Sequence, residues 1–344
     1  MRFRAARSAV WGGLLLAIAT TPTWAQARSP LDVLREALRS GALGPATVLS
    51  YTATCEAETH DPFSSVTGVT GRTRYVERVD GPRQRRRIDY QAPGQLLNIV
   101  VLEDPTSIYQ WDTQRGIAIR QDNNACAMLP SIERDRLAIL SENYTASIVG
   151  KSTVAGRPCL IVEVMPVRQG NPWRRIYVDR DKLLPLRTEN ANGAGFLTHS
   201  MAVVDISYSI PGDPGMFQLP PGTIVRDDPV ERSVALPMNR LEEKAGFAPI
   251  APGYVPAGYR FAGGQVIRAG DSTVIHLMYF DGMSTVSLFE ELVAPGARGG
   301  GQDWMPGEVG ASGLSWVAPG GAVAFTLIGD VLPQELEKVK GSLR

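Results

Sequence analysis

Short runs of alternating apolar and polar residues dominate the chain, and they predict β-strands along most of its length. A short helix is expected first, at 30–41, where leucines recur on one face and a glycine follows. One further helix is expected in this half, at 129–144. Gly, Asp, Asn and Pro separate the strands, which favours neighbour-to-neighbour pairing in a strongly curved antiparallel sheet over βαβ units. The predicted strands are 48–59, 73–79, 85–90, 95–104, 107–112, 116–121, 159–167, 173–180, 183–191 and 196–209.

The pattern changes at residues 211–245, which are rich in proline and glycine, show little periodicity, and predict a linker. A second block follows with a hairpin, short strands to Ile328, and a closing helix from Pro333. The expected fold class is therefore α+β. We predict a signal peptide at 1–25, an unclosed antiparallel half-barrel over helices at 30–210, the linker at 211–245, and a smaller α+β domain at 246–344.

The hairpin of the second block, at 274–290, is apolar on both faces. Asp281-Gly282 predicts a two-residue turn, which would set Tyr279 opposite Ser284. One face is ordinary core material, but the second would otherwise meet water. We therefore expect the second face to contact either the other domain or a partner protein. The residues expected to make this contact are Val274, Met278, Phe280 and Met283.

The N-terminus carries three arginines before an apolar run that ends in small residues, the layout of a secretory signal. Cleavage is expected after Ala25 or Ala27, so we expect an exported protein. The whole chain balances 35 basic residues against 35 acidic ones, which gives no indication of nucleic-acid binding.

Candidate catalytic chemistry is sparse. His60, His199 and His276 are the only histidines, and their separation does not fit a metal site. The sequence has no nucleophile elbow, phosphate-binding loop or dinucleotide fingerprint. We therefore expect a binding protein without a cofactor or a metal, not an enzyme.

Three cysteines allow at most one intramolecular disulfide. Cys126 and Cys159 form the favoured pair because both flank strand-like segments of one region. The alternative is that Cys55, Cys126 and Cys159 are all buried thiols.

Two further features have open interpretations. Arginines crowd the predicted hairpin at 72–87, and Arg85 and Arg87 would either clamp a lipid phosphate or solvate a sheet edge. Apolar residues on the curved sheet would either line a lipid slot or fill a core. These lining residues are Leu49, Tyr51, Ile99, Val101, Leu160, Val162 and Met201.

Glycines, prolines and arginines in a fixed order then connect the chain to a known family. They run from Gly150 through the sequence VAGR at 154–157 to Pro166, the arginine pair 174–175, Asp179 and the sequence LPL at 184–186. With these residues the chain resembles the MucB/RseB family. YFDGMSTVSLFEE and AFTLIGDVLPQELEKVKGSL, in the second block, are similar to the hairpin and closing segment of that family.

The resemblance implies a large domain similar to the lipoprotein carriers LolA and LolB. It also implies a periplasmic negative regulator of envelope-stress sigma factor signalling. Such a protein would bind the periplasmic segment of a transmembrane anti-sigma factor and protect it from proteolysis, with lipid or lipopolysaccharide relieving the inhibition. The alternative is a periplasmic lipid or lipoprotein carrier of the LolA type. Whether the chain forms a homo-oligomer is left open by the sequence.

Overall fold

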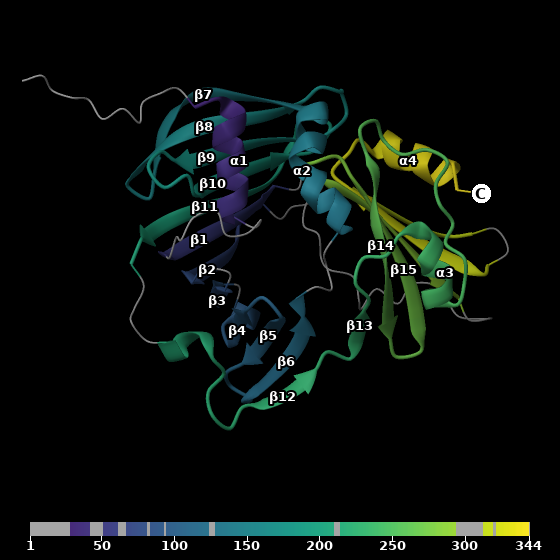
Figure 1. Ribbon diagram of the computed structural model, residues 1–344, viewed down its shortest axis with the longest axis horizontal. Helices are drawn as coiled ribbons and strands as arrows, with labels where there is room; N and C mark the ends of the chain where they lie inside the picture. The colour runs from purple at the N-terminus through teal and green to yellow at the C-terminus, as the bar shows by residue number, and fades with distance from the viewer. Residues whose placement is uncertain are drawn as a thin grey trace, which may run out of the picture.

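A computed structural model gives the fold of the chain (Figure 1). It describes residues 28–41, 51–60, 67–80, 83–92, 94–123, 128–209, 214–293, 312–318 and 321–343. The predicted signal peptide, Leu49 and Cys126 lie outside the described residues.

The larger of two sheets has 12 strands in the order β12-β6-β5-β4-β3-β2-β1-β11-β10-β9-β8-β7. Two meanders meet where β1 pairs with β11, and the edge strands β12 and β7 do not pair with each other, so the sheet is unclosed. Only β12, which runs parallel to β6, departs from antiparallel pairing. The strands are β1 (Tyr51–His60), β2 (Thr67–Asp80), β3 (Arg83–Ala92), β4 (Ile99–Glu103), β5 (Ser107–Asp112), β6 (Ile117–Asp122), β7 (Tyr144–Val154), β8 (Arg157–Pro166), β9 (Trp173–Asp179), β10 (Pro185–Ala191), β11 (Leu197–Ser207) and β12 (Ile224–Asp227).

Two helices cover this sheet, as the sequence predicted (Figure 1). Ser29 caps α1 (Pro30–Gly41), because its hydroxyl accepts a hydrogen bond from the backbone N–H of Asp32 at 3.1 Å. α2 (Pro130–Asn143) begins with proline, whose fixed φ suits the first helical turn. Apolar side chains of both helices pack with β8 and β9 in one cluster: Val33, Leu34, Ala37, Leu140, Val162, Val164, Ile176 and Val178.

The family-like motif VAGR lies at the β7–β8 turn. Ala155 and Gly156, its two central residues, have φ values of 48° and 71°. Positive φ at both positions is the mark of the type I′ turn, whose twist matches that of the flanking strands. The motif is therefore a structural device that fixes the register of β7, a strand that the sequence pattern did not predict.

The second sheet has six strands in the order β13-β14-β15-β16-β18-β17. The strands are β13 (Val230–Arg232), β14 (Arg260–Ala269), β15 (Ser272–Phe280), β16 (Thr285–Leu292), β17 (Ser312–Val317) and β18 (Val323–Gly329). α3 (Met238–Ala245) and α4 (Pro333–Gly341) complete this half. Outside it, short 3₁₀ turns lie between β3 and β4 at Gly94–Leu96 (η2) and between β11 and β12 at Pro214–Phe217 (η4).

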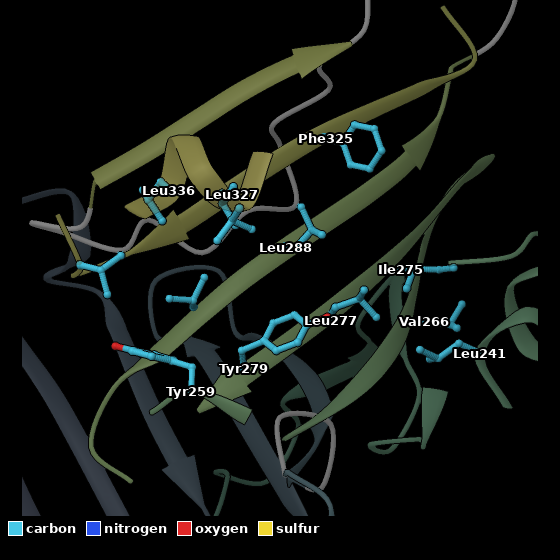
Figure 2. Packing of buried hydrophobic residues seen from close by; sticks show 13 residues of the cluster. Leu241, Tyr259, Val266, Ile275, Leu277, Tyr279, Leu288, Phe325, Leu327 and Leu336 are labelled. Atoms are coloured by element: carbon cyan, nitrogen blue, oxygen red, sulfur yellow. The ribbon is translucent and has the colours of Figure 1, made fainter. Parts of the chain in front are cut away.

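The core of the second sheet lies on the face covered by α3 and α4. Figure 2 shows Ile275, Leu277 and Tyr279 of β15 in one packed layer with Leu288 of β16 and Leu327 of β18. Leu241 of α3 and Leu336 of α4 close this layer, and both are essentially inaccessible to solvent. The predicted core face of the hairpin is thus confirmed.

The predicted hairpin turn is wrong by two residues. Tyr279 pairs with Val286, not with Ser284, and the loop comprises Asp281, Gly282, Met283 and Ser284. The Asp281 carboxylate causes the difference, because it accepts hydrogen bonds from the backbone N–H groups of Met283 at 2.9 Å and Ser284 at 2.8 Å. Since a shift of two keeps every side chain on its face, the predicted faces survive the error.

The stretch predicted to be a linker contains regular structure. Within 211–245, β12 joins the large sheet, β13 joins the small sheet, and α3 follows. The sequence showed no periodicity here because such short strands give too few alternations to detect. The expected α+β class is confirmed, with an unclosed sheet over helices and a smaller second sheet.

Candidate functional site

The loop of the β15–β16 hairpin docks onto the large sheet at the junction of α2 and β7. We call this contact the seam; it consists of the hairpin, α2 with the preceding Met128–Leu129, and the start of β7. Asn143, the last residue of α2, donates hydrogen bonds from Nδ2 to the carbonyls of Gly258 at 3.1 Å and Asp281 at 2.9 Å. Tyr144, the first residue of β7, donates its hydroxyl to the Asp281 carboxylate. The seam is therefore fixed by directional polar contacts as well as by packing.

The seam is dry. Asp281 is completely buried, and Tyr144 is 3% exposed. Burial, reinforced by the charge of Asp281, raises the pKa of the Tyr144 phenol far above its ordinary value. Burial likewise raises the pKa of Tyr259, whose hydroxyl lies 2.5 Å from that of Ser284. Both phenols are therefore neutral at any physiological pH.

Gly282 brings the two backbones into direct contact. It has a φ of +104°, and a Cβ built on it would lie 2.4 Å from the Cα of Leu140. A side chain cannot be accommodated there without displacing α2, so glycine is required both by the backbone conformation and by the close approach.

Apolar packing surrounds this polar centre. Met283 belongs to the cluster formed by α1, α2, β8 and β9. Met278 and Phe280 pack with Met128 and Ile132, ahead of and within α2. The guanidinium of Arg136 lies 5.3 Å from the centre of the Phe280 ring. The second apolar face of the hairpin thus contacts the other sheet, one of the two partners expected from the sequence.

The four residues predicted to bind a partner are all buried in this structure. Met278, Phe280 and Met283 lie in the seam, whereas Val274 packs with Ile267 and Phe289 on the small sheet itself. Their predicted role in partner binding stays a prediction.

Further hydrogen bonds hold the sheets together at two other places. Near α4, the N–H of Gly193 donates to the carbonyl of Asp330 at 2.8 Å, and Asn171 donates to the carbonyl of Ala257 at 3.0 Å. At the far end, Asp228 links β6 to β13. Its carboxylate accepts hydrogen bonds from Gln121 at 2.7 Å and Arg232 at 2.9 Å.

Most of the predicted lipid-lining residues belong to packed clusters. Leu160 and Val162 contact the helices α1 and α2, and Tyr51 and Met201 pack against the cluster that contains Cys55 and Cys159. Ile99 and Val101 are half-buried on β4. Leu160 and Val162 thus have the packing expected of a filled core, and lipid binding by the set stays a prediction.

The described arginines of the 72–87 hairpin make internal contacts. Arg87 forms an ion pair with Asp89 at 2.7 Å and donates to the carbonyl of Met216 at 2.9 Å. The guanidinium of Arg85 lies 5.6 Å from the centre of the Phe217 ring. Both side chains therefore hold the η4 segment against β3, and a headgroup role for them stays a prediction.

The predicted disulfide between Cys126 and Cys159 is not formed. Cys159 is a free, buried thiol within an apolar cluster, and its Sγ lies 3.4 Å from the carbonyl of Arg157. Burial raises the pKa of this thiol, which disfavours the reactive thiolate.

Sequence reasoning missed the polar residues of the seam. Asn143, Tyr144 and Asp281 gave no signal as a group, because 138 positions separate Asn143 from Asp281. The local signal was the turn dipeptide Asp281-Gly282, which marks the loop but not its partner. Among the described residues, no three His, Cys, Asp or Glu side chains gather to hold a metal.

Comparison with known proteins identifies the fold. Residues 70–222 match the model of the MucB/RseB N-terminal domain. The chain is similar to the structure of the Pseudomonas aeruginosa MucA/MucB complex, with 19% identity and a TM-score of 0.62 over 92% of this chain and 99% of that one. Another structure, MucB in complex with MucA(peri), gives 19% identity and a TM-score of 0.58 over 92% and 97% of the two chains.

A structure of MucB gives 18% identity and a TM-score of 0.55 over 91% of this chain and 96% of that one. A search of curated proteins finds no match. The family match covers most of the large sheet, and the shared fold extends over both sheets. The chain therefore carries a MucB/RseB N-terminal domain at residues 70–222.

Proposed function

We propose that this protein is a periplasmic negative regulator of envelope-stress sigma factor signalling. It binds the periplasmic segment of a transmembrane anti-sigma factor and thereby protects that segment from proteolysis. The observation that supports this function is the whole-chain likeness to MucB, whose structures include complexes with MucA. A chain that kept only the large sheet would fit a carrier equally well, but this one shares both sheets with the regulator.

Export fits this proposal. The sequence begins with the layout of a secretory signal, and no helix among the described residues is long and apolar enough to cross a membrane. The anti-sigma segment is therefore expected to meet this protein on the exported side of the membrane.

The seam sets how the two sheets are presented to such a partner. A partner that contacts both sheets requires them at a fixed separation. The hydrogen bonds of Asn143 and Tyr144 to Asp281 maintain this separation. In this proposal, the buried side chains of Met278, Phe280 and Met283 do not touch the partner. They affect its binding indirectly, by keeping the two sheets in place. Their substitution would weaken affinity by altering the placement of the sheets.

The experiment is a calorimetric titration of the purified mature chain with the periplasmic segment of an anti-sigma factor from the same genome. Binding should be specific, and it should slow cleavage of that segment by the first protease of the cascade. Met278→Asp places an unpaired charge in the seam and should lower both affinity and stability. Leu292→Asp is the control, because Leu292 is 50% exposed on β16.

Failure of the wild type to bind the segment would refute the regulatory function. Relief of inhibition by lipid or lipopolysaccharide is a separate part of the proposal. It predicts that either ligand restores cleavage of the bound segment. Recovery of a tightly bound acyl lipid from the purified protein, together with absence of segment binding, would favour the carrier function instead.

A further inference from the structure

Two arginines of the large sheet and its helices lie at the seam without a strong anionic partner. Arg136 is on α2, and Arg174 is on β9. Arg136 lies 4.0 Å from Glu133, at the limit of an ion pair, and its buried Nε has no hydrogen-bond partner among the described residues. The guanidinium of Arg174 makes no hydrogen bond or ion pair with any residue that the structure describes.

The two arginines line one small cavity. Its other walls are apolar side chains of α1, α2, β8 and β9 together with the hairpin residues Gly282 and Met283. The positive charge of Arg174 is close enough to contribute, after burial, to the lowered pKa of Arg136. Two like charges held together in an apolar surrounding carry an electrostatic cost that a bound anion would offset.

The other charged and titratable groups near the seam do not fill this role. Asp281 is already satisfied by Tyr144 and by two backbone N–H groups. Asp330 attracts Arg174 across the seam but forms no ion pair with it, and burial raises the pKa of the Asp330 carboxyl. Glu133 is 37% exposed and offers only the distant contact to Arg136.

We propose that Arg136 and Arg174 form a binding site for a single oxyanion, a phosphate or a carboxylate. Guanidinium groups suit such anions because their N–H donors are planar and match the spacing of the oxygens. The cavity has a volume of about 10 Å³, the room of one water molecule, so it cannot enclose a phosphate, and the oxyanion would have to bind over its opening. A ligand with an apolar body would have to displace Met283 and so would loosen the seam.

Calorimetric titration of the mature chain with three probes tests this site. The probes are inorganic phosphate, octyl phosphate and octyl glucoside, the last two below their micellar concentrations. We expect phosphate or octyl phosphate to bind, with affinity reduced at least tenfold in both Arg136→Gln and Arg174→Gln. Arg134→Gln is the matched control, since Arg134 is exposed two residues away on the same helix.

Two further variants separate binding from folding. Arg174→Lys keeps the charge and should retain part of the affinity even if Arg174→Gln is less stable. Asp330→Asn removes a competing negative charge near Arg174 and should tighten phosphate binding. Both effects require an anion at this site and would not follow from a purely structural role of the arginines.

The relative affinities identify the source of the oxyanion. Similar binding of phosphate and octyl phosphate supports a free anion, whereas much tighter octyl phosphate binding supports an amphiphile. The proposal is overturned if octyl glucoside binds as tightly as octyl phosphate, if Arg134→Gln loses as much affinity, or if no probe binds. None of these results bears on whether the chain binds the anti-sigma segment.

Discussion

Tyr144 supplies the donor that links the two sheets most directly. Its hydroxyl serves the fully buried carboxylate of Asp281, and water cannot replace it there. Tyr144→Phe should lower the free energy of unfolding by about 1.5–3 kcal/mol, the range for hydrogen bonds to charged groups. Urea denaturation measures this loss. Tyr254→Phe, which removes a hydroxyl from the less buried Glu335, should cost less, and an equal loss would contradict the special role of the seam.

Glu290 makes stability depend on pH. Its side chain is completely buried, and burial raises its pKa to about 7. Among the described residues, only its Oε2 has a hydrogen-bond partner, the N–H of Ile250 at 2.8 Å. The folded chain therefore holds this proton more tightly than the unfolded chain, whose carboxyl titrates near 4.5. Its contribution to stability is greatest below about 4.5, falls as pH rises to about 7, and is flat above that value.

Glu290→Gln should abolish this decline and stabilise the chain at pH 8 by up to about 3 kcal/mol, the free energy that corresponds to the pKa change. Thermal melts between pH 4 and pH 8 measure the effect. Glu337→Gln, which changes an exposed carboxyl on α4, should leave the pH profile as it is in the wild type. A wild-type profile that is flat from pH 4.5 to pH 7 would show that Glu290 is ionised in the folded state.

At the scale of elements, two turns of the small sheet allow a matched comparison. Gly282 and Gly270 both have positive φ, but a Cβ at Gly270 would meet no atom within 4 Å. Gly270→Ala should therefore cost about 1 kcal/mol, from backbone strain alone. Gly282→Ala adds a clash with the backbone of Leu140, so it should cost clearly more and displace the hairpin from α2.

Thermal denaturation measures the two costs, and small-angle X-ray scattering measures the displacement as an increased radius of gyration. Equal destabilisation by the two alanines, with an unchanged radius, would mean that α2 yields easily to the added methyl group. The contact between the hairpin and α2 would then be easily deformed, and the seam would not set the relative placement of the two sheets.

At the scale of the whole molecule, β12 and β13 form a strap between the sheets, and Asp228 secures it. Because its carboxylate ties Gln121 to Arg232, Asp228→Ala should free the stretch 211–245 for proteolysis. We expect faster trypsin cleavage there, with stable fragments of about 200 and 100 residues, in accordance with the predicted domains. Asp227→Ala is the control because its side chain is 75% exposed. Cleavage at many scattered sites would argue against two domains.

Local alternation was enough to predict most strands, both early helices and the two apolar faces of the hairpin. These features depend on the period of a single element, which neighbouring residues set. The family likeness was also accessible, because its motifs are turn residues such as Ala155 and Gly156, whose backbone conformations leave a mark in the sequence.

Tertiary structure alone decided what the second face of the hairpin meets and how its loop closes. The Asp281 carboxylate accepts a backbone hydrogen bond within the loop, and this sets the observed register of the hairpin. The same carboxylate accepts a hydrogen bond from the hydroxyl of Tyr144, 137 positions away. That Arg136 and Arg174 line one cavity likewise depends on how α2 packs against the sheet. No local period encodes such pairs, because they are selected by packing between elements that are distant in the chain.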